Sequence, residues 1–238
     1  MTAGNLVLYD GCVAHRGKFI TFEGLDGCGK STQVEKLAAA LRARGLAVVV
    51  TREPGGTPTA EKIRQLLLDT KTATLAPMAE LALMFASRAQ HIQEVIAPAL
   101  SVGKIVLCDR FTDSTEAYQG GGRKLGTEPV LELHRILCGN LQPDLTILMD
   151  TDAAMSVARA RRRNQARGKK KGSAAHDENR FEQESQGFFG RVHQAYWAIA
   201  KREPERVAIA DARGTPDETH RSIMEVVRRK LKLAAKGA

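Results

Sequence analysis

The residues with the clearest chemical meaning in this chain form one short run, Gly24-Leu25-Asp26-Gly27-Cys28-Gly29-Lys30-Ser31. The run fits G-x-x-x-x-G-K-[ST], a pattern in which the backbone N–H groups of a glycine-rich loop point at phosphate oxygens. In that pattern the lysine reaches the β- and γ-phosphates, and the hydroxyl after it binds Mg²⁺. The run therefore predicts a site for the phosphates of a nucleoside triphosphate, with Lys30 and Ser31 in these roles and Thr32 beside the α-phosphate.

Polar side chains follow three other apolar runs of the chain, at the points where those runs end. Arg52, Asp109 with Arg110, and Asp150 occupy these positions. Because ligands of an open parallel sheet bind beyond the carboxyl ends of its strands, we expect these side chains beside the phosphate loop. Asp109 is the stronger candidate for a second Mg²⁺ ligand, in the manner of a Walker B aspartate. Asp150 is interpreted as part of the start of the next helix.

The longest helical pattern, 78–100, carries an arginine within its apolar face. At about 100° per residue, Arg88 falls in the middle of this face, whose apolar members are Leu81, Phe85, Ile92, Val95 and Ala99. A buried guanidinium without a partner is unfavourable, so two interpretations are open. One is a structural ion pair. The other, which we favour, is contact with an anionic ligand, with Phe85 one turn away as an aromatic wall.

The segment 114–123 combines polar side chains with three consecutive glycines. Ser114, Thr115, Tyr118 and Gln119 precede those glycines. One interpretation is that the side chains contact the edge of a base while the glycines form a flexible hinge. A solvated turn is the alternative, and the segment alone does not decide between them.

Five short apolar runs, rich in Val, Ile and Leu, alternate with helical patterns along the chain. Runs without polar residues at alternate positions are typical of strands buried on both faces of a parallel sheet. The alternation indicates right-handed βαβ units. We therefore predict an α/β protein with a P-loop kinase fold, a five-stranded parallel sheet flanked by helices. The expected strands are 18–23, 46–51, 104–109, 144–150 and 206–211.

The basic charge of the chain is concentrated in two segments, 159–171 and 228–236. The chain has 238 residues and a net charge of +9, and eight basic residues with no acidic one lie in 159–171. Such a segment fits a clamp on small polyphosphates as well as it fits a nucleic-acid surface, so composition does not decide between the two. We interpret about 159–180 as a mobile lid within a single domain, 17–238, that follows an N-terminal extension, 1–16.

The expected compartment follows from what the sequence lacks. No apolar run approaches the ~20 residues of a membrane helix, and the first residues do not form a signal-peptide pattern. The four cysteines form no CxxC pair, which indicates reduced thiols. We therefore expect a cytoplasmic protein without a membrane partner.

Five segments in this order resemble those of the thymidylate kinase family, and the similarity extends over nearly the whole chain. The segments are Phe22-Glu23-Gly24-Leu25-Asp26-Gly27, Thr51-Arg52-Glu53-Pro54-Gly55-Gly56-Thr57, Arg88-Ala89-Gln90-His91, Asp109-Arg110-Phe111 with 114–123, and Arg180-Phe181-Glu182-Gln183-Glu184. The resemblance implies ATP-dependent phosphorylation of dTMP to dTDP for dTTP synthesis, by direct in-line transfer with Mg²⁺. It also implies a homodimer, since the family is commonly dimeric, and no nucleic-acid partner.

The resemblance assigns roles to individual residues. Asp26 resembles the carboxylate near the 3′-hydroxyl of dTMP, and Arg88 with Arg110 resembles the pair that binds the monophosphate and the thymine edge. Phe85 resembles the ring that stacks on thymine, although the family usually places this ring four residues before the arginine, where this chain has Met84. The residues so assigned to dTMP are Asp26, Arg52, Phe85, Arg88, Arg110, Ser114, Thr115, Tyr118 and Gln119.

The catalytic cations are expected in the lid. Some family members carry a catalytic arginine at the position of Gly27, and the bacterial pattern supplies the cations from the lid instead. Four lid arginines match that pattern: Arg159, Arg161, Arg163 and Arg167. Together with Lys30 and Arg110, we expect Arg159 and Arg163, which are four residues apart and share a helical face, to be catalytic.

Two other functions remain open for the phosphate loop. A related nucleotide or nucleoside kinase would carry the same loop and act on another acceptor. A P-loop ATPase could bind nucleic acid through the basic segment, but no aromatic residues are interleaved with that segment to stack on bases. A GTPase is disfavoured because the chain contains no NKxD-type segment that reads guanine.

Overall fold

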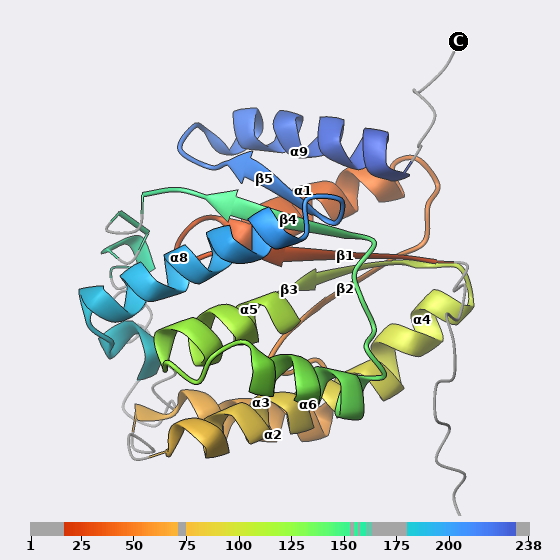
Figure 1. Cartoon of the computed structure of the whole chain (residues 1–238). Helices are drawn as coiled ribbons and strands as arrows, with labels where there is room; N and C mark the ends of the chain where they lie inside the picture. Colours follow the sequence, from red (N-terminus) through yellow and green to blue (C-terminus); the bar gives the residue numbers. More distant parts are fainter. Residues whose placement is uncertain are drawn as a thin grey trace, which may run out of the picture.

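The structure is a computed structural model that describes residues 17–70, 75–152, 155–156, 158–160, 162 and 180–231. The expected extension over 1–16 and most of the expected lid lie outside these residues. The described residues build one sheet with helices on both sides (Figure 1).

The sheet has five strands, and each strand pair in it is parallel. The order across the sheet is β2-β3-β1-β4-β5, with the pairs β1–β3, β1–β4, β2–β3 and β4–β5 all parallel. The strands are β1 (Lys18–Glu23), β2 (Val48–Arg52), β3 (Ile105–Asp109), β4 (Leu145–Asp150) and β5 (Val207–Asp211). The predicted α/β class, the strand number and the position of every strand are confirmed.

The helices connect these strands in the order expected for βαβ units. They are α1 (Lys30–Arg42), α2 (Pro58–Leu68), α3 (Pro77–His91), α4 (Ala97–Ser101), α5 (Thr112–Thr115), α6 (Glu128–Cys138), α8 (Gln186–Arg202) and α9 (Pro216–Leu231). Two π-helical segments, η2 (Ile92–Ile96) and η3 (Glu116–Gly122), and one 3₁₀ turn, η4 (Arg180–Gln183), complete the described elements.

Alternate residues of each strand face different helices, because successive side chains of a strand point to opposite faces. Ile20 and Phe22 of β1 belong to the apolar cluster that α1 and α9 cover. Phe19 of β1 belongs instead to a cluster with α3, α4 and α6. A third cluster lies between α8 and η3. Figure 1 shows α9 on one side of the sheet and α2, α3 and α6 on the other.

A π-helical segment changes the apolar face of the long helix. α3, η2 and α4 follow one another without a break, as the pattern over 78–100 predicts. Val95, expected on the buried face, is only partly buried, whereas Ile96 is completely buried. A π-helical turn contains more residues than an α-helical turn, so Ile96 takes the buried position expected for Val95, whereas Ile92 and Ala99 are buried as predicted. The assumption of 100° per residue is wrong in this segment.

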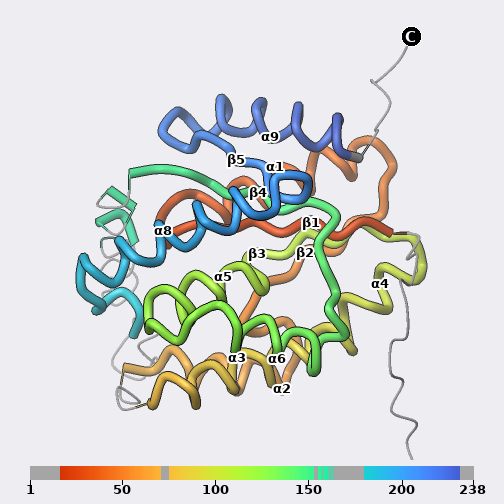
Figure 2. The backbone as a smooth tube through the Cα atoms, in the orientation of Figure 1, coloured from red at the N-terminus to blue at the C-terminus, as the bar shows by residue number. Residues whose placement is uncertain are grey.

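The carboxyl ends of the strands lie together at one edge of the sheet. In Figure 2 the chain leaves β1, β4 and β5 on the same side. The loop between β1 and α1, the turn after β2 and the start of α5 after β3 therefore meet at this edge, which is where an open parallel sheet binds its ligands.

Candidate active site

The glycine-rich loop joins β1 to α1, as its pattern predicts. Gly24, Gly27 and Gly29 have φ values of 131°, 84° and 96°, in the region that favours glycine. A Cβ atom at Gly24 would lie 2.7 Å from the Met149 carbonyl oxygen. The glycines therefore allow the loop both to turn and to pass close to β4, so that it opens at the N-terminus of α1.

Lys30 is buried and lies across the loop. Its Nζ donates hydrogen bonds to the carbonyl oxygens of Gly24, at 3.0 Å, and Leu25, at 2.9 Å. The ammonium group is thus held over the centre of the loop, where a positive charge is needed to bind phosphates.

The two expected metal ligands, Ser31 and Asp109, contact each other. Ser31 Oγ donates a hydrogen bond to Asp109 Oδ2 at 2.9 Å. They come together because β1 and β3 are neighbours, with Phe22 opposite Asp109 in the register. A hydroxyl and a carboxylate are hard oxygen ligands, and this donor set fits Mg²⁺.

Arg110 connects the phosphate loop to the rest of the site. Its Nη2 donates to Asp26 Oδ1 at 2.9 Å and to the Tyr118 hydroxyl at 3.2 Å. Its Nη1 donates to Ser114 Oγ at 2.9 Å and to the Tyr196 hydroxyl at 3.1 Å. Burial lowers the pKa of Arg110, but Asp26 together with Tyr118, Tyr196 and Asp109 outweighs this effect, and the pKa is raised well above its usual value. Arg110 therefore stays charged beside the loop.

Arg110 also has an unusual backbone conformation. Its φ is 74°, in the left-handed region that a residue with a Cβ rarely adopts. Such strain persists only where surrounding contacts hold it, and it is concentrated at functional sites. The four side-chain hydrogen bonds of Arg110 supply those contacts here.

Glu23, the last residue of β1, lies beneath Arg110 and is completely buried. Its carboxylate accepts hydrogen bonds from the Phe111 backbone N–H at 2.7 Å, from the Tyr196 hydroxyl at 3.2 Å, and from Ser114 Oγ. Burial, with the nearby charge of Asp113, raises the pKa of Glu23 to about 7. No local sequence pattern indicates a role for Glu23, or for Tyr196, which is distant in sequence and part of an ordinary apolar helix face.

Arg88 forms the structural ion pair that was one of its two interpretations, and contact with an anionic ligand stays a prediction. Its Nε donates to Glu53 Oε2 at 2.7 Å and its Nη2 to Thr115 Oγ1 at 2.8 Å. Its guanidinium carbon lies 4.8 Å from the centre of the Phe85 ring and 5.1 Å from that of Phe111. Nη1 is buried and has no hydrogen-bond partner among the described residues. A structural ion pair is present, and one amino group is left over for a ligand.

Phe85 does not line the site. It is 0% exposed and belongs to the core cluster of Phe19 and Phe111, with Arg88 against its ring. Its expected place as an aromatic wall facing the ligand is therefore corrected, because the helix turns this residue into the core. Met84, one residue earlier, lies instead in the cluster that contains Tyr118.

The polar side chains of 114–122 have different hydrogen-bond partners, and only some of them lie at the phosphate loop. Tyr118 donates to Asp26 Oδ2 at 3.4 Å and so lies at the loop. Gln119 is buried, and its amide nitrogen donates to Glu80 Oε1 at 2.7 Å. The amide nitrogen of Gln119 is thus used within the protein. Ser114 accepts a hydrogen bond from Arg110, and Thr115 accepts one from Arg88. Each hydroxyl therefore holds an arginine side chain in place.

Arg52 lies at the rim. It pairs with Glu61 at 2.9 Å, and its side chain is 51% exposed. In the register of β2 and β3 it stands opposite Asp109, so it is near the expected metal ligands.

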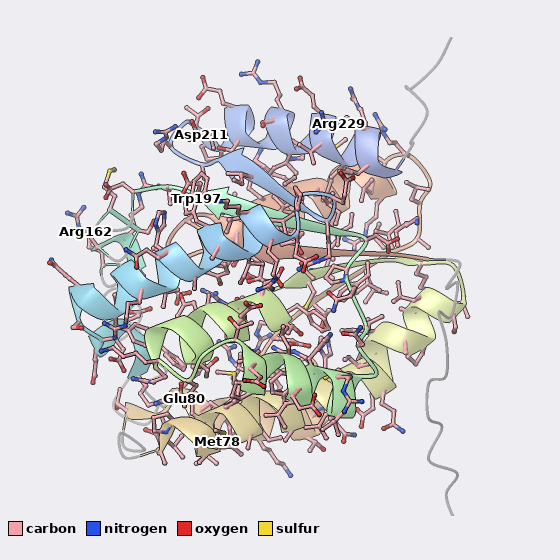
Figure 3. All side chains as sticks on the ribbon, viewed as in Figure 1. Met78, Glu80, Arg162, Trp197, Asp211 and Arg229 are labelled. Carbon is pink, nitrogen blue, oxygen red and sulfur yellow. The ribbon has the colours of Figure 1, made fainter. Side chains whose placement is uncertain are left out.

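The described part of the lid packs on the phosphate loop at Gly27. A Cβ atom on Gly27 would lie 2.2 Å from the Ser156 carbonyl oxygen and 3.0 Å from the Ala160 nitrogen. The close approach of this backbone explains why no side chain is present there. Arg159 is exposed, and Arg162 also extends outward (Figure 3). Arg161, Arg163 and Arg167 lie outside the described residues.

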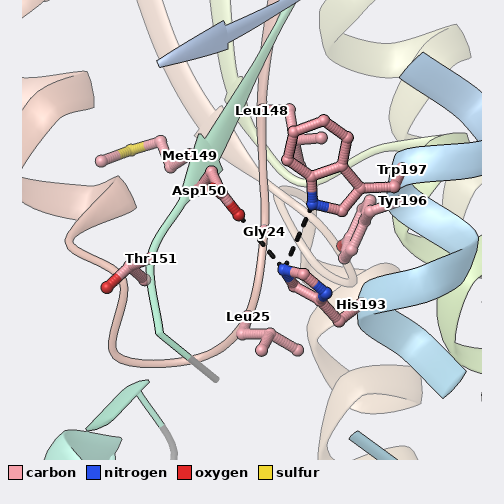
Figure 4. Close-up of a pocket in the computed structure, with 9 residues that line it drawn as sticks. All are labelled: Gly24, Leu25, Leu148, Met149, Asp150, Thr151, His193, Tyr196 and Trp197. Atoms are coloured by element: carbon pink, nitrogen blue, oxygen red, sulfur yellow. Dashed lines mark hydrogen bonds and ion pairs between the residues drawn. The ribbon is translucent and has the colours of Figure 1, made fainter. Parts of the chain in front are cut away.

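Asp150 lines a small pocket on the β4 side of the loop. His193 Nε2 lies 3.2 Å from Asp150 Oδ1 and 3.3 Å from Trp197 Nε1 (Figure 4). The helix start is marked by Asp152, whose carboxylate accepts a hydrogen bond from the Met155 N–H at 2.8 Å. The residue at the helix start is therefore Asp152 and not Asp150, which is the last residue of β4. The pocket also reaches Gly24 and Leu25.

Comparison with known proteins agrees with this arrangement. The family profile described as thymidylate kinase matches residues 22–223. A thymidylate kinase of Geobacter sulfurreducens is 46% identical over 211 residues, covering 89% of this chain and 96% of that protein. One of Pseudomonas putida (strain W619) is 50% identical over 205 residues, covering 86% and 93%.

A solved structure is also similar. The crystal structure of thymidylate kinase from Ehrlichia chaffeensis superposes with a TM-score of 0.70 at 32% identity, covering 89% of this chain and 98% of that one. Among the described residues, no helix is both long and apolar enough to cross a membrane. Profile, relatives and structure agree over most of the chain, and on that ground the chain belongs to the thymidylate kinase family, whose members phosphorylate dTMP to dTDP with ATP.

Proposed function

We propose that residues 17–238 form one catalytic domain that transfers the γ-phosphoryl group of ATP to dTMP by direct in-line attack. The observation that carries this proposal is the 2.9 Å ion pair between Asp26, within the phosphate loop, and Arg110, after β3. It supports a single site in which the donor and the acceptor lie side by side. Phosphoryl transfer depends mainly on such alignment and on neutralising charge.

On the donor side, the loop 24–32 would hold the phosphates of ATP. Lys30 Nζ would exchange its bonds to two loop carbonyls for bonds to the β- and γ-phosphates. Ser31 and Asp109 would hold Mg²⁺, which when bound would neutralise charge on the phosphate oxygens. The lid would add Arg159 and Arg163 as catalytic cations, and its closure would exclude water.

On the acceptor side, Arg110 and Arg52 would bind the phosphate of dTMP, and Asp26 with Tyr118 would contact the sugar. Arg88 Nη1, the unpartnered donor, would bind the base edge. We propose Met84, in place of Phe85, as the residue against the flat face of thymine. The phosphate of dTMP is itself an anionic nucleophile, so this reaction needs no general base.

The acceptor assignment is tested with steady-state rates. With ATP and Mg²⁺, dTMP, dUMP, dCMP, dGMP and AMP are compared as acceptors, and we expect the highest kcat/KM for dTMP. A kcat/KM for dTMP no higher than for the other four would contradict the proposal. It would favour a related kinase with another acceptor. An ATPase activity stimulated by DNA would favour the nucleic-acid alternative.

We also propose a homodimer formed through α2, α3 and α6. Among the described residues, half of the large apolar side chains that are exposed lie on these three helices: Leu66, Met78, Leu131, Ile136 and Leu137. Met78 lies at the lower surface of the molecule in Figure 3. Sedimentation should give twice the chain mass of 25.9 kDa, and Met78→Lys should shift it to one chain mass. A wild-type monomer would refute this part.

A cytoplasmic location without membrane or nucleic-acid partners completes the proposal. The three described cysteines, Cys28, Cys108 and Cys138, are free and buried, which supports a reducing compartment. Cell fractionation of the native protein tests this location.

A further inference from the structure

The turn after β2 is tied to α3 by a chain of buried hydrogen bonds. Glu53, only 4% exposed, accepts from Arg88 Nε at 2.7 Å and contacts His91 Nδ1 at 2.9 Å. His91 Nε2 lies 2.6 Å from Thr51 Oγ1. Four side chains from β2, the turn and α3 are thus linked in the order Thr51, His91, Glu53, Arg88.

The direction of these hydrogen bonds is determined by Glu53. Burial raises the pKa of Glu53, but Arg88 and His91 outweigh that effect, so the pKa is lowered and the carboxylate is ionised. An ionised carboxylate can only accept, so His91 must carry its proton on Nδ1. Nε2 is left for the contact with the Thr51 hydroxyl. Each member of the chain has one defined role.

The His91 ring is also held in place by shape. Gly56 has a φ of 88°, and a Cβ atom there would lie 2.5 Å from His91 Nε2 and 2.8 Å from Thr51 Oγ1. The next residue back, Gly55, donates its backbone N–H to Ser87 Oγ at 3.2 Å. The imidazole fills the space that the glycine leaves, and its side chain is completely buried beside Glu53.

These contacts leave the Arg88 guanidinium almost no freedom. Its Nε is held by Glu53 and its Nη2 by Thr115, and its planar group lies against the rings of Phe85 and Phe111. Only Nη1 has no partner among the described residues. The direction in which this amino group points is therefore set by the contacts of Glu53, Thr115 and the two rings with the guanidinium.

We propose that Glu53 and His91 are positioning residues that orient Arg88 Nη1 towards the base of the acceptor. This inference rests on the proposed function, in which Arg88 contacts that base. Nη1 can only donate a hydrogen bond. An Arg88 held in this orientation therefore favours a base with a carbonyl oxygen at this edge and disfavours a base with an amino group there. The pair would thereby set both affinity for dTMP and discrimination against dCMP.

A purely structural role is the main competing explanation. A buried ion pair contributes to folding, and its loss would lower stability without a selective effect on one substrate. A metal site is a second competing explanation, since ligand atoms of Glu53, His91 and Cys108 lie within 4.8 Å of one another. Both carboxylate oxygens and both imidazole nitrogens already have protein partners, which argues against it.

The first experiment is Glu53→Ala, measured by KM and kcat for each substrate. We expect KM for dTMP to rise at least about tenfold, while KM for ATP stays unchanged and kcat falls much less. The preference for dTMP over dCMP should fall as well. The matched control is Glu116→Ala, which removes another buried carboxylate that binds an arginine, Arg202, at 2.7 and 2.8 Å. Its KM for dTMP should match that of the wild type.

Two substitutions of His91 give a test that does not depend on Glu53. In His91→Asn the amide nitrogen stands near the position of Nδ1 and can still donate to Glu53. In His91→Gln the amide reaches towards Thr51 and loses Glu53. Positioning predicts a larger rise of KM for dTMP in His91→Gln, although glutamine is closer to histidine in volume. A KM that is equal in both variants, or lower in His91→Gln, would overturn the inference.

Arg88→Met separates this inference from the proposed function. If it leaves KM for dTMP unchanged, Arg88 does not contact the acceptor and the proposed site is wrong. If it raises KM for dTMP while Glu53→Ala and both His91 variants do not, the site stands and the positioning role is refuted.

Discussion

Replacing Glu23 with glutamine is expected to change how stability depends on pH. The Glu23 side chain is completely buried, and burial together with Asp113 raises its pKa from 4.5 to about 7. Between these values the folded protein keeps a proton that the unfolded chain has released. The free energy of unfolding therefore falls as pH rises through this window. At about 1.36 kcal/mol per pH unit, the total is roughly 3 kcal/mol.

His134 has the opposite effect in nearly the same window. Burial, with the charge of Arg88, lowers its pKa from 6.5 to about 4. The unfolded chain then holds a proton that the folded protein lacks, so stability rises with pH between these values, again by roughly 3 kcal/mol. In the wild type the two contributions largely cancel. Removing Glu23 should expose the contribution of His134.

The assay is urea unfolding at several pH values between 4.5 and 7.5, for the wild type and Glu23→Gln. We expect the stability of the variant relative to the wild type to increase by roughly 3 kcal/mol from pH 4.5 to 7.5. Glu132→Gln, at an exposed position, is the control. A difference between Glu23→Gln and wild type that stays constant within about 0.5 kcal/mol would refute the argument, since Glu23 would then titrate alike in both states.

Three further predictions concern the phosphate side of the site. Arg163→Ala should lower kcat at least about tenfold while ATP affinity changes little, measured by turnover and by equilibrium titration; an unchanged kcat would place the catalytic cation elsewhere. Ser31→Ala should raise the Mg²⁺ concentration needed for half-maximal rate, and an unchanged Mg²⁺ dependence would exclude Ser31 as a ligand. The fluorescence of Trp197, the one tryptophan of the chain, should change when a non-hydrolysable ATP analogue binds, because Trp197 shares a pocket with Gly24 and Leu25; no change would show that this pocket does not sense the loop.

Local patterns carried most of the prediction of the fold. The strands are apolar runs of five or six residues. Each such run can be recognised from its own residues, without knowledge of distant contacts. The one error of register, at Val95, arose because a π-helical turn has no distinct sequence signal and replaces Val95 by Ile96 on the buried face.

Residues that contact partners far along the chain were predicted less well. Phe85 and Met84 are adjacent, and only the rotation of α3 against its neighbours decides which of them packs in the cluster of Tyr118 and which in the cluster of Phe111. Tyr196 lies 173 residues from Glu23, and the two meet because α8 packs over the end of β1. No local pattern reports such a contact.

The sequence by itself determined the phosphate loop, the strands and the residues at the strand ends, since these depend on spacing within a few positions. Gly24 to Ser31 and Asp109 could be identified before any packing was known. The tertiary structure alone decided how Arg110 joins Asp26 to Tyr118, and how Glu53 and His91 hold Arg88. A buried charge is stable only beside its partners, and those partners come from separate elements that the order of strands in the sheet brings together.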